Sequence, residues 1–230
     1  MGKRKRGSAM RREDGIQVSW QEVRRTLTLE GETVLEYTLS WPEVSGAGLG
    51  GRWINGYYAR LARSWRERWE REVYWKACLE LGERRERARP FHPWQGELRG
   101  EVALLEEGIL SLRFTGWETR GDGRPNRVRW GDVWKVRSGA PCPLRALMGN
   151  KRGWKGRLWK ELVRQGEGRR AGGDLFLDRD WEKKAKAARP LKGWCLTREG
   201  IEVSLPQGTA APAAEGCPVF LLPREQEEQT

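Results

Sequence analysis

The strongest constraint on the fold is a long helical signal between residues 52 and 89. Apolar and aromatic side chains recur there at spacings of three and four, with arginine and glutamate at the other positions. The apolar positions are Trp53, Ile54, Tyr57, Tyr58, Leu61, Trp65, Trp69 and Val73. This stripe predicts an amphipathic helix that lies on a sheet. We interpret it as core rather than as a platform on which bases or sugars stack.

Strand-like segments precede and follow this helix. Residues 16–39 alternate as two strands divided by a turn at Glu30 and Gly31, and residues 98–137 alternate as a three-stranded meander. Helical patterns follow at 144–165 and 176–188, with a glycine-rich break between them that we expect to be a mobile loop. A hairpin at 194–205, a corner of small residues and a last strand at 217–222 complete the chain.

These elements predict an α+β fold. We expect a single antiparallel meander-type sheet packed against one long amphipathic helix plus one or two shorter helices. The chain has 230 residues and no stretch of linker composition, which predicts one domain over residues 16–223. Residues 1–15 are predicted to be a basic disordered tail, and residues 224–230 a second disordered tail.

The sequence also bears on the compartment. No apolar run approaches the ~20 residues that a membrane-spanning helix needs. The basic start MGKRKRGSAMRR is followed by EDGIQVSWQE where a signal peptide would have its apolar region. We therefore expect a cytoplasmic chain, as the sequence is written.

The net charge of +12 favours acidic partners such as nucleic acid, anionic lipid or an acidic protein. However, the chain has 33 Arg against 11 Lys, and 14 Trp against 4 Tyr and 4 Phe. Residues with GC-rich codons thus replace AT-rich equivalents throughout, which the base composition of a genome can cause in any protein. The charge by itself does not identify a nucleic-acid surface.

The central strands carry the candidate ligand-binding residues. Strict alternation places five basic side chains on the face opposite the apolar one, and the central turn adds two arginines. The seven candidates are Arg113, Arg120, Arg124, Arg127, Arg129, Lys135 and Arg137. An ordinary solvent-exposed sheet face, which normally carries Lys, Arg and Thr, is the alternative interpretation.

The usual components of catalysis are missing from the sequence. His92 is the single histidine and lies close to Pro90 and Pro93, and no serine or cysteine stands in a nucleophile elbow. The four cysteines, which include Cys195 and Cys217, form no CxxC pair, which argues against a zinc site. We expect a non-enzyme without cofactor or metal. The cysteines are expected to be reduced thiols, although Cys195 and Cys217 lie on neighbouring predicted strands and could pair in an oxidising compartment.

Several segments, taken in order, resemble a known domain. They are LSWPEVSG with INGYYARLARSW, then LSLRFTGWETRGDGRPN and WGDVWKVRSGAPCPLRAL, and finally WCLTREGIEVSLPQGTAAPAAEGCPVFLLP. Together they resemble the RsiV-like domain, which is shared by the ectodomain of the anti-sigma factor RsiV and the deacetylase PdaC. The resemblance covers about residues 33–223. It departs from the family at the central turn, where Gly121 to Pro125 lack the usual histidine, and at Ala146, where an acidic residue is common.

The resemblance implies a non-catalytic ligand-recognition module that binds a protein or a cell-wall-related partner. It also implies that the corner of small residues lets the chain add a last strand to the central sheet. Relatives of the RsiV type are extracytoplasmic, and in RsiV the partner is lysozyme. A chain with a charge of +12 would repel a basic lysozyme, so an acidic protein partner is expected here. The alternative is a nucleic-acid-binding protein that uses the same arginines on phosphates.

Overall fold

The computed structural model describes residues 5–13, 15–121, 123–148, 152–188 and 193–223. The chain falls into two compact units. The N-terminal unit comprises residues 1–100, 115–126 and 137–139, and the C-terminal unit comprises 101–114, 127–136 and 140–230. The residues of the single domain expected over 16–223 lie in both units. The boundaries fall within or beside strands, so no change in composition marks them in the sequence.

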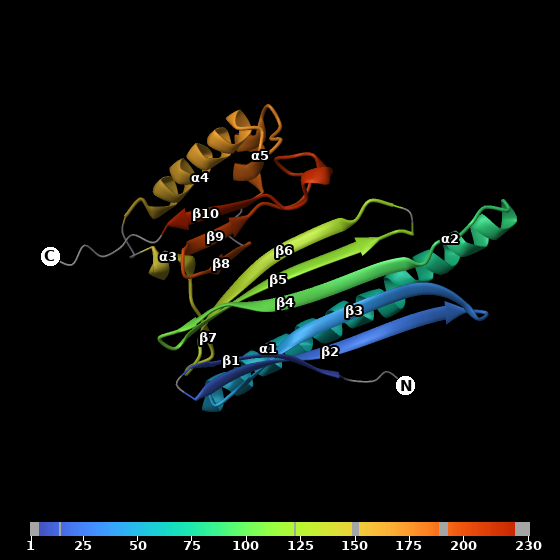
Figure 1. Cartoon of the computed structure of the whole chain (residues 1–230), viewed down its shortest axis with the longest axis horizontal. Coiled ribbons are helices and arrows are strands. Elements are labelled where there is room, and N and C mark those ends of the chain that lie inside the picture. The colour runs from blue at the N-terminus through green and yellow to red at the C-terminus, as the bar shows by residue number, and fades with distance from the viewer. Residues whose placement is uncertain (1–4, 14, 122, 149–151, 189–192, 224–230) are drawn as a thin grey trace. The chain divides into compact units, whose positions relative to one another are not determined.

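The first sheet has its strands in sequence order, β1 to β7 (Figure 1). They are β1 (Lys5–Glu13), β2 (Ile16–Leu29), β3 (Glu32–Ser45), β4 (Trp94–Glu106), β5 (Ile109–Thr119), β6 (Asn126–Lys135) and β7 (Ala140–Pro141). Strands β4, β5 and β6 contribute residues to both units. Strand β4 pairs with β3 in parallel, because the long helix between them returns the chain to the end where β3 began.

A second sheet has the order β10-β9-β8, with β8 at Trp194–Leu196, β9 at Gly200–Ser204 and β10 at Val219–Pro223. The α+β class and the long helix are confirmed, whereas the single antiparallel sheet is corrected to two sheets, the first of which contains the parallel pairing of β3 with β4. The corner of small residues does return the chain to add β10, but beside β9 rather than to the central strands. One parallel bridge, between Gly131 and Gly193, links the two ladders. Strand β8 has only three residues, so few backbone N–H and C=O groups are present to extend the pairing beyond this bridge.

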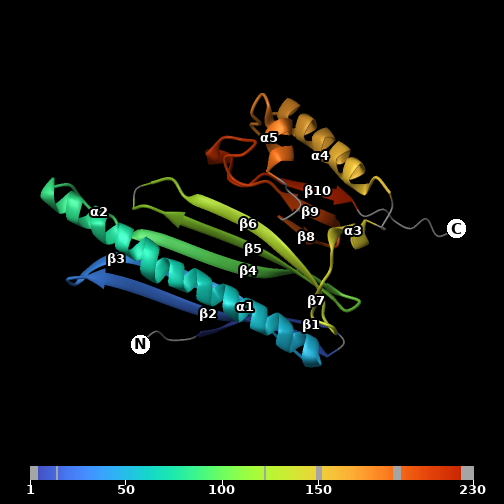
Figure 2. The same cartoon turned by 180° about the vertical axis from the view of Figure 1, so that it is seen from behind.

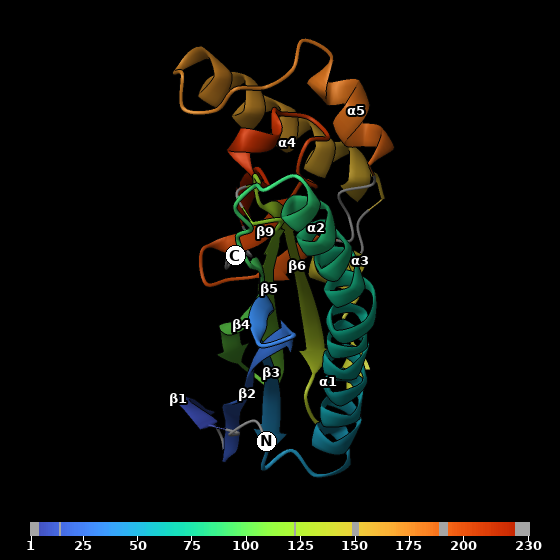
Figure 3. The ribbon, with the colours of Figure 1, turned by 90° about the vertical axis from the view of Figure 1, so that its right-hand side faces the viewer.

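The long helix is confirmed over 39 residues. It consists of α1 (Gly48–Arg68), a π-helical segment (Trp69–Val73) and α2 (Tyr74–Glu86). Figures 2 and 3 show α1 along one face of β2 and β3. Ile54, Tyr58 and Trp69 are buried, but Trp53 is 68% exposed. The stripe is wider than the sheet can cover, because Trp53 points about 100° away from Ile54 around the helix.

Trp69 anchors the helix to the sheet in the N-terminal unit. Its ring lies against Gly96, where an added Cβ would come within 3.0 Å of the ring. Its indole Nε1 donates to Glu118 at 2.6 Å, and its ring centroid is 4.9 Å from that of Tyr37. Burial, together with a hydrogen bond to Glu70, raises the pKa of the Tyr37 hydroxyl.

The C-terminal unit has its own core. Helices α3 (Leu144–Leu147), α4 (Trp154–Ala171) and α5 (Trp181–Ala187) and the 3-10 turn Ala213–Glu215 accompany strands β8 to β10. Trp181 and Phe220 stack with centroids 6.4 Å apart within a buried cluster. The expected mobile loop after residue 165 is instead the end of α4. The glycine at 166 is explained by packing, since it lies against the Trp181 ring.

This contact predicts the effect of a single methyl group. In Gly166→Ala the new Cβ would lie 2.5 Å from Trp181 Cη2, and Trp181 is only 1% exposed. We expect a loss of about 2 kcal/mol in the free energy of unfolding, measured by urea titration. Gly168 lies in the same helix with open space around it, so Gly168→Ala should raise stability by up to about 1 kcal/mol. Equal effects of the two substitutions would contradict this packing.

The ends of the chain differ partly from expectation. Residues 5–13 of the expected disordered tail form β1, because the outer edge of β2 offers unpaired backbone groups. Residues 1–4 and the predicted tail 224–230 lie outside the described residues. None of the helices described here is long and apolar enough to cross a membrane.

Candidate functional site

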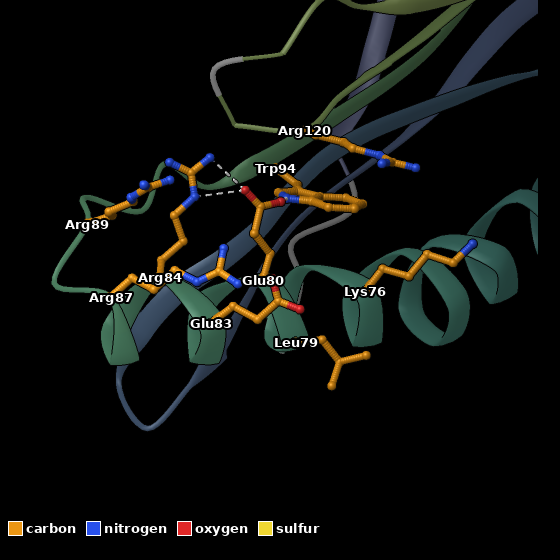
Figure 4. A pocket seen from close by; sticks show the side chains of 9 residues that line it. All are labelled: Lys76, Leu79, Glu80, Glu83, Arg84, Arg87, Arg89, Trp94 and Arg120. Atoms are coloured by element: carbon orange, nitrogen blue, oxygen red, sulfur yellow. Dashed lines mark hydrogen bonds and ion pairs between the residues drawn. The ribbon is translucent and has the colours of Figure 1, made fainter.

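A pocket of about 650 Å³ lies in the N-terminal unit between α2 and the sheet (Figure 4). We call it the basic pocket, because five of the nine side chains that line it are basic and two are acidic. The lining residues are Lys76, Leu79, Glu80, Glu83, Arg84, Arg87, Arg89, Trp94 and Arg120. Its volume is within the range of roughly 300–1,000 Å³ that is typical of ligand sites.

Three segments bring these side chains together. Helix α2 supplies most of them, because Lys76, Glu80 and Arg84 recur every fourth residue and therefore lie on one stripe. The chain turns after α2 through Ala88, whose φ of 51° is left-handed, and then presents Arg89. Trp94 opens β4, and Arg120 follows the end of β5.

Trp94 is the fixed centre of the basic pocket. It is 6% exposed, and its indole Nε1 donates to Glu80 Oε2 at 2.8 Å. Arg84 donates to the other oxygen of Glu80 from Nε at 3.0 Å and from Nη2 at 2.8 Å. A further bond from Arg84 Nη1 to the Pro90 carbonyl, at 3.1 Å, ties the network to the loop after the helix. The carboxylate of Glu80 is thus occupied in holding Trp94 and Arg84 in place.

The remaining cations give the pocket its chemistry. The guanidinium of Arg120 lies over the Trp94 ring, with Cζ 5.3 Å from the centroid. Within the described part of the chain, the side chains of Lys76, Arg87 and Arg89 have no ion-pair partner. A carboxylate or phosphate group that entered here would meet several unneutralised donors beside a flat aromatic ring.

The structure places the seven candidate residues of the sequence analysis in different environments. Only Arg120 lines the basic pocket. Arg124 and Arg137 are exposed and also belong to the N-terminal unit, whereas Arg127 and Lys135 are exposed on β6 in the C-terminal unit.

Arg113 and Arg129 converge on a third residue, Glu202 of β9. Arg113 Nη1 lies 2.5 Å from Glu202 Oε2, and Arg129 Nη2 lies 2.6 Å from Oε1. The side chain of Glu202 is 12% exposed, and those of the two arginines are 22% exposed. The alternation that predicted a basic face could not show this, because Glu202 is 89 positions from Arg113. The two arginines are held in an internal ion-pair network.

The sequence interpretation missed most of the basic pocket. The run ERRERAR at residues 83–89 was part of the helix and resembled an ordinary solvated face. A usable signal was the Trp94 that follows this run after a short proline-containing loop. A dense basic stretch followed by an aromatic residue can place cations around a ring when the chain turns back between them.

Cys195 contacts the Glu202 network. Its Sγ lies 3.7 Å from Glu202 Oε1, and it is 2% exposed. Burial, and then the nearby carboxylate of Glu202, raise the pKa of this thiol to about 12. Cys195 and Cys217 are both free cysteines in this structure. Among the described residues, no group of three or more His, Cys, Asp or Glu side chains could hold a metal ion.

Comparison with known proteins places the fold. No family model matches the chain, and no curated protein matches it. A solved structure of a DUF3298 family member from Bacteroides fragilis is 15% identical, with a TM-score of 0.64 over 98% of this chain and 94% of that one. A DUF3298 family protein from Pseudomonas aeruginosa is 12% identical, with a TM-score of 0.53 over 97% and 90%. The chain has a DUF3298-type fold. At these identities the likeness concerns the fold alone, and the DUF3298-type fold carries no function with it.

Proposed function

We propose that this chain is a non-catalytic recognition domain that binds an acidic protein through the basic pocket. The observation that carries the proposal is the excess of basic side chains around a fixed Trp94 ring. The resemblance to the RsiV-like domain supports protein recognition as the role. The charge of the pocket favours an acidic partner over a basic one such as lysozyme.

The chemistry of the basic pocket suits a carboxylate at a protein surface. Arg87 and Arg120 present planar guanidinium groups, which can bind a carboxylate through two parallel hydrogen bonds. Leu79 is 68% exposed at the pocket and offers apolar contact beside the charges. Arginine and tryptophan are the residues that most often dominate binding energy at protein interfaces. An aspartate or glutamate on a partner loop would therefore find both charge and a buried platform.

The nucleic-acid alternative has less support. It relied on Arg113 and Arg129 as phosphate contacts, and both are engaged with Glu202. It also relied on one continuous basic face, whereas the seven candidates are divided between two units. Binding of single-stranded DNA, measured beside binding of an acidic peptide, distinguishes this alternative from the proposal.

Binding should depend on the cations of the pocket and not on overall charge. We expect a glutamate-rich peptide to bind the wild type, to bind more weakly as salt is raised, and to bind Arg87→Gln/Arg120→Gln about tenfold or more weakly. The matched control is Arg52→Gln/Arg60→Gln, which removes the same charge from exposed positions on α1 and should leave affinity within about twofold.

Fluorescence anisotropy with labelled peptides measures these affinities. A lysine-rich peptide should not bind, and single-stranded DNA of equal charge should bind more weakly than the glutamate-rich peptide. Equal loss in the pocket and control variants would contradict the proposal, because diffuse charge would then suffice. Tighter binding of DNA that also falls with salt would favour the nucleic-acid alternative.

A further inference from the structure

A second opening lies in the N-terminal unit between α1 and strands β2 and β3. We call it the α1 groove; its volume is about 460 Å³. Val23, Leu39 and Trp41 supply apolar surface from the strands, and Arg25, Arg63 and Arg66 supply positive charge. It shares no lining residue with the basic pocket, so neither site depends on the other.

The strand register and two small residues create this groove. Val23 is paired with Leu39, and Arg25 with Tyr37, so all four side chains are on one face of the sheet. The helix opposite presents Ala59 and Ala62, whose methyl groups are too short to fill the space. Larger side chains at these two positions would close the groove without disturbing the strands.

Arg25 has an unusual environment for a charged side chain. Its Nε is buried and has no hydrogen-bond partner among the described residues. A guanidinium donor in this situation is a costly group unless an acceptor reaches it.

The other charges around the groove add to this effect. Arg63 and Arg66 come from α1, and none of the described residues that line the groove is acidic. The ion pair of Arg66 is a long one, from its Nε to Glu70 Oε2 at 3.9 Å. The other oxygen of Glu70 accepts the Tyr37 hydroxyl at 2.5 Å. Three guanidinium groups therefore border an apolar surface with little compensation by acid.

We propose that the α1 groove binds an amphiphilic organic carboxylate, with its charge at Arg25 and its apolar body on Val23, Leu39 and Trp41. The carboxylate would give Arg25 Nε its missing acceptor and separate the like charges of Arg63 and Arg66. The hydrocarbon part would cover the half-buried side chains of Val23 and Trp41, which are otherwise partly in contact with water. The volume of the groove is in the range of small-molecule sites.

Isothermal titration calorimetry of the whole chain with decanoate tests this assignment. We expect decanoate to bind, 1-decanol to bind at least about tenfold more weakly, and decyltrimethylammonium not to bind, all at concentrations below micelle formation. Arg25→Met should weaken decanoate about ten- to a hundredfold, because a charge-assisted hydrogen bond is lost. Arg52→Met, which removes one exposed cation from α1, should leave decanoate affinity unchanged.

A second variant separates the shape of the groove from its charge. Ala59→Met keeps all three arginines and suits a helix, but its longer side chain should obstruct the groove and weaken decanoate at least about tenfold. Thermal unfolding of each variant without ligand verifies that it is folded. Equal affinity for decanoate and decanol, or wild-type affinity in Arg25→Met or in Ala59→Met, would overturn the assignment. None of these results depends on whether the basic pocket binds an acidic protein.

Discussion

Replacing Glu202 by glutamine is expected to lower the free energy of unfolding by about 3–5 kcal/mol. Glutamine keeps the size of the side chain but removes the charge that Arg113 and Arg129 share. Arg129 would then lose its carboxylate partner in a largely buried site, and Arg113 would keep only the exposed Glu101. Breaking a buried ion pair at one partner is costly because the other partner cannot regain its water. Urea titration followed by tryptophan fluorescence measures the loss.

Glu101 provides the matched control. It binds the same Arg113, at 2.6 Å from Nε, but its side chain is 60% exposed. Glu101→Gln should therefore cost no more than about 1 kcal/mol, since water screens an exposed pair. If Glu202→Gln were as mild as Glu101→Gln, the Glu202 network would not be a buried determinant of stability.

The second large effect concerns alkaline pH. The thiol of Cys195 has a pKa raised to about 12, from the ordinary 9.0 that it has when unfolded. Below pH 9 the thiol is protonated in both states and stability does not depend on it. Between pH 9 and 12 only the unfolded state releases the proton, so the free energy of unfolding falls as pH rises. The total loss across this range is on the order of 4 kcal/mol.

Cys195→Ala isolates this contribution from other groups that titrate at high pH. The substitution also changes the absolute stability, so the comparison is between the slopes of the free energy of unfolding against pH from 9 to 12. We expect the wild type to have the steeper slope. Parallel curves for the two proteins would show that Cys195 does not resist ionisation in the folded state.

The sequence predicted the helices and strands that are determined by residues close together in the chain. The spacing of Ile54, Tyr58 and Trp69 predicted the long helix, and alternation predicted the strands, because both patterns depend on residues close in the chain. The parallel pairing of β3 with β4 was not predicted. It depends on how a helix of 39 residues returns the chain, which no local pattern of residues 94–98 records.

The candidate sites were predictable only in part, for the same physical reason. Arg120 was singled out from its turn, but its partner Trp94 is reached through the fold rather than through any repeat. The alternation of their own strands predicted Arg113 and Arg129 to be available to a ligand, because it contains no information on acidic residues elsewhere in the chain. Their acid comes from β9, at a separation along the chain where sequence spacing carries no information on contact.

The π-helical segment Trp69–Val73 has a consequence for chains of slightly different length. Its wider turn accommodates one residue more than a regular helix would need. Deleting a single residue there would restore regular winding, and the residues beyond it would keep the direction in which they now face, because the wider turn absorbs the extra residue. Deleting a residue from the regular helix between residues 74 and 79 would instead rotate everything beyond it by about 100°. Glu80 and Arg84 would then swing away from Trp94, while Ala59 and Ala62 would keep their position. A related chain shortened by one within the π-helical segment should therefore retain both the α1 groove and the basic pocket, whereas one shortened by one in the following turn should lose the basic pocket.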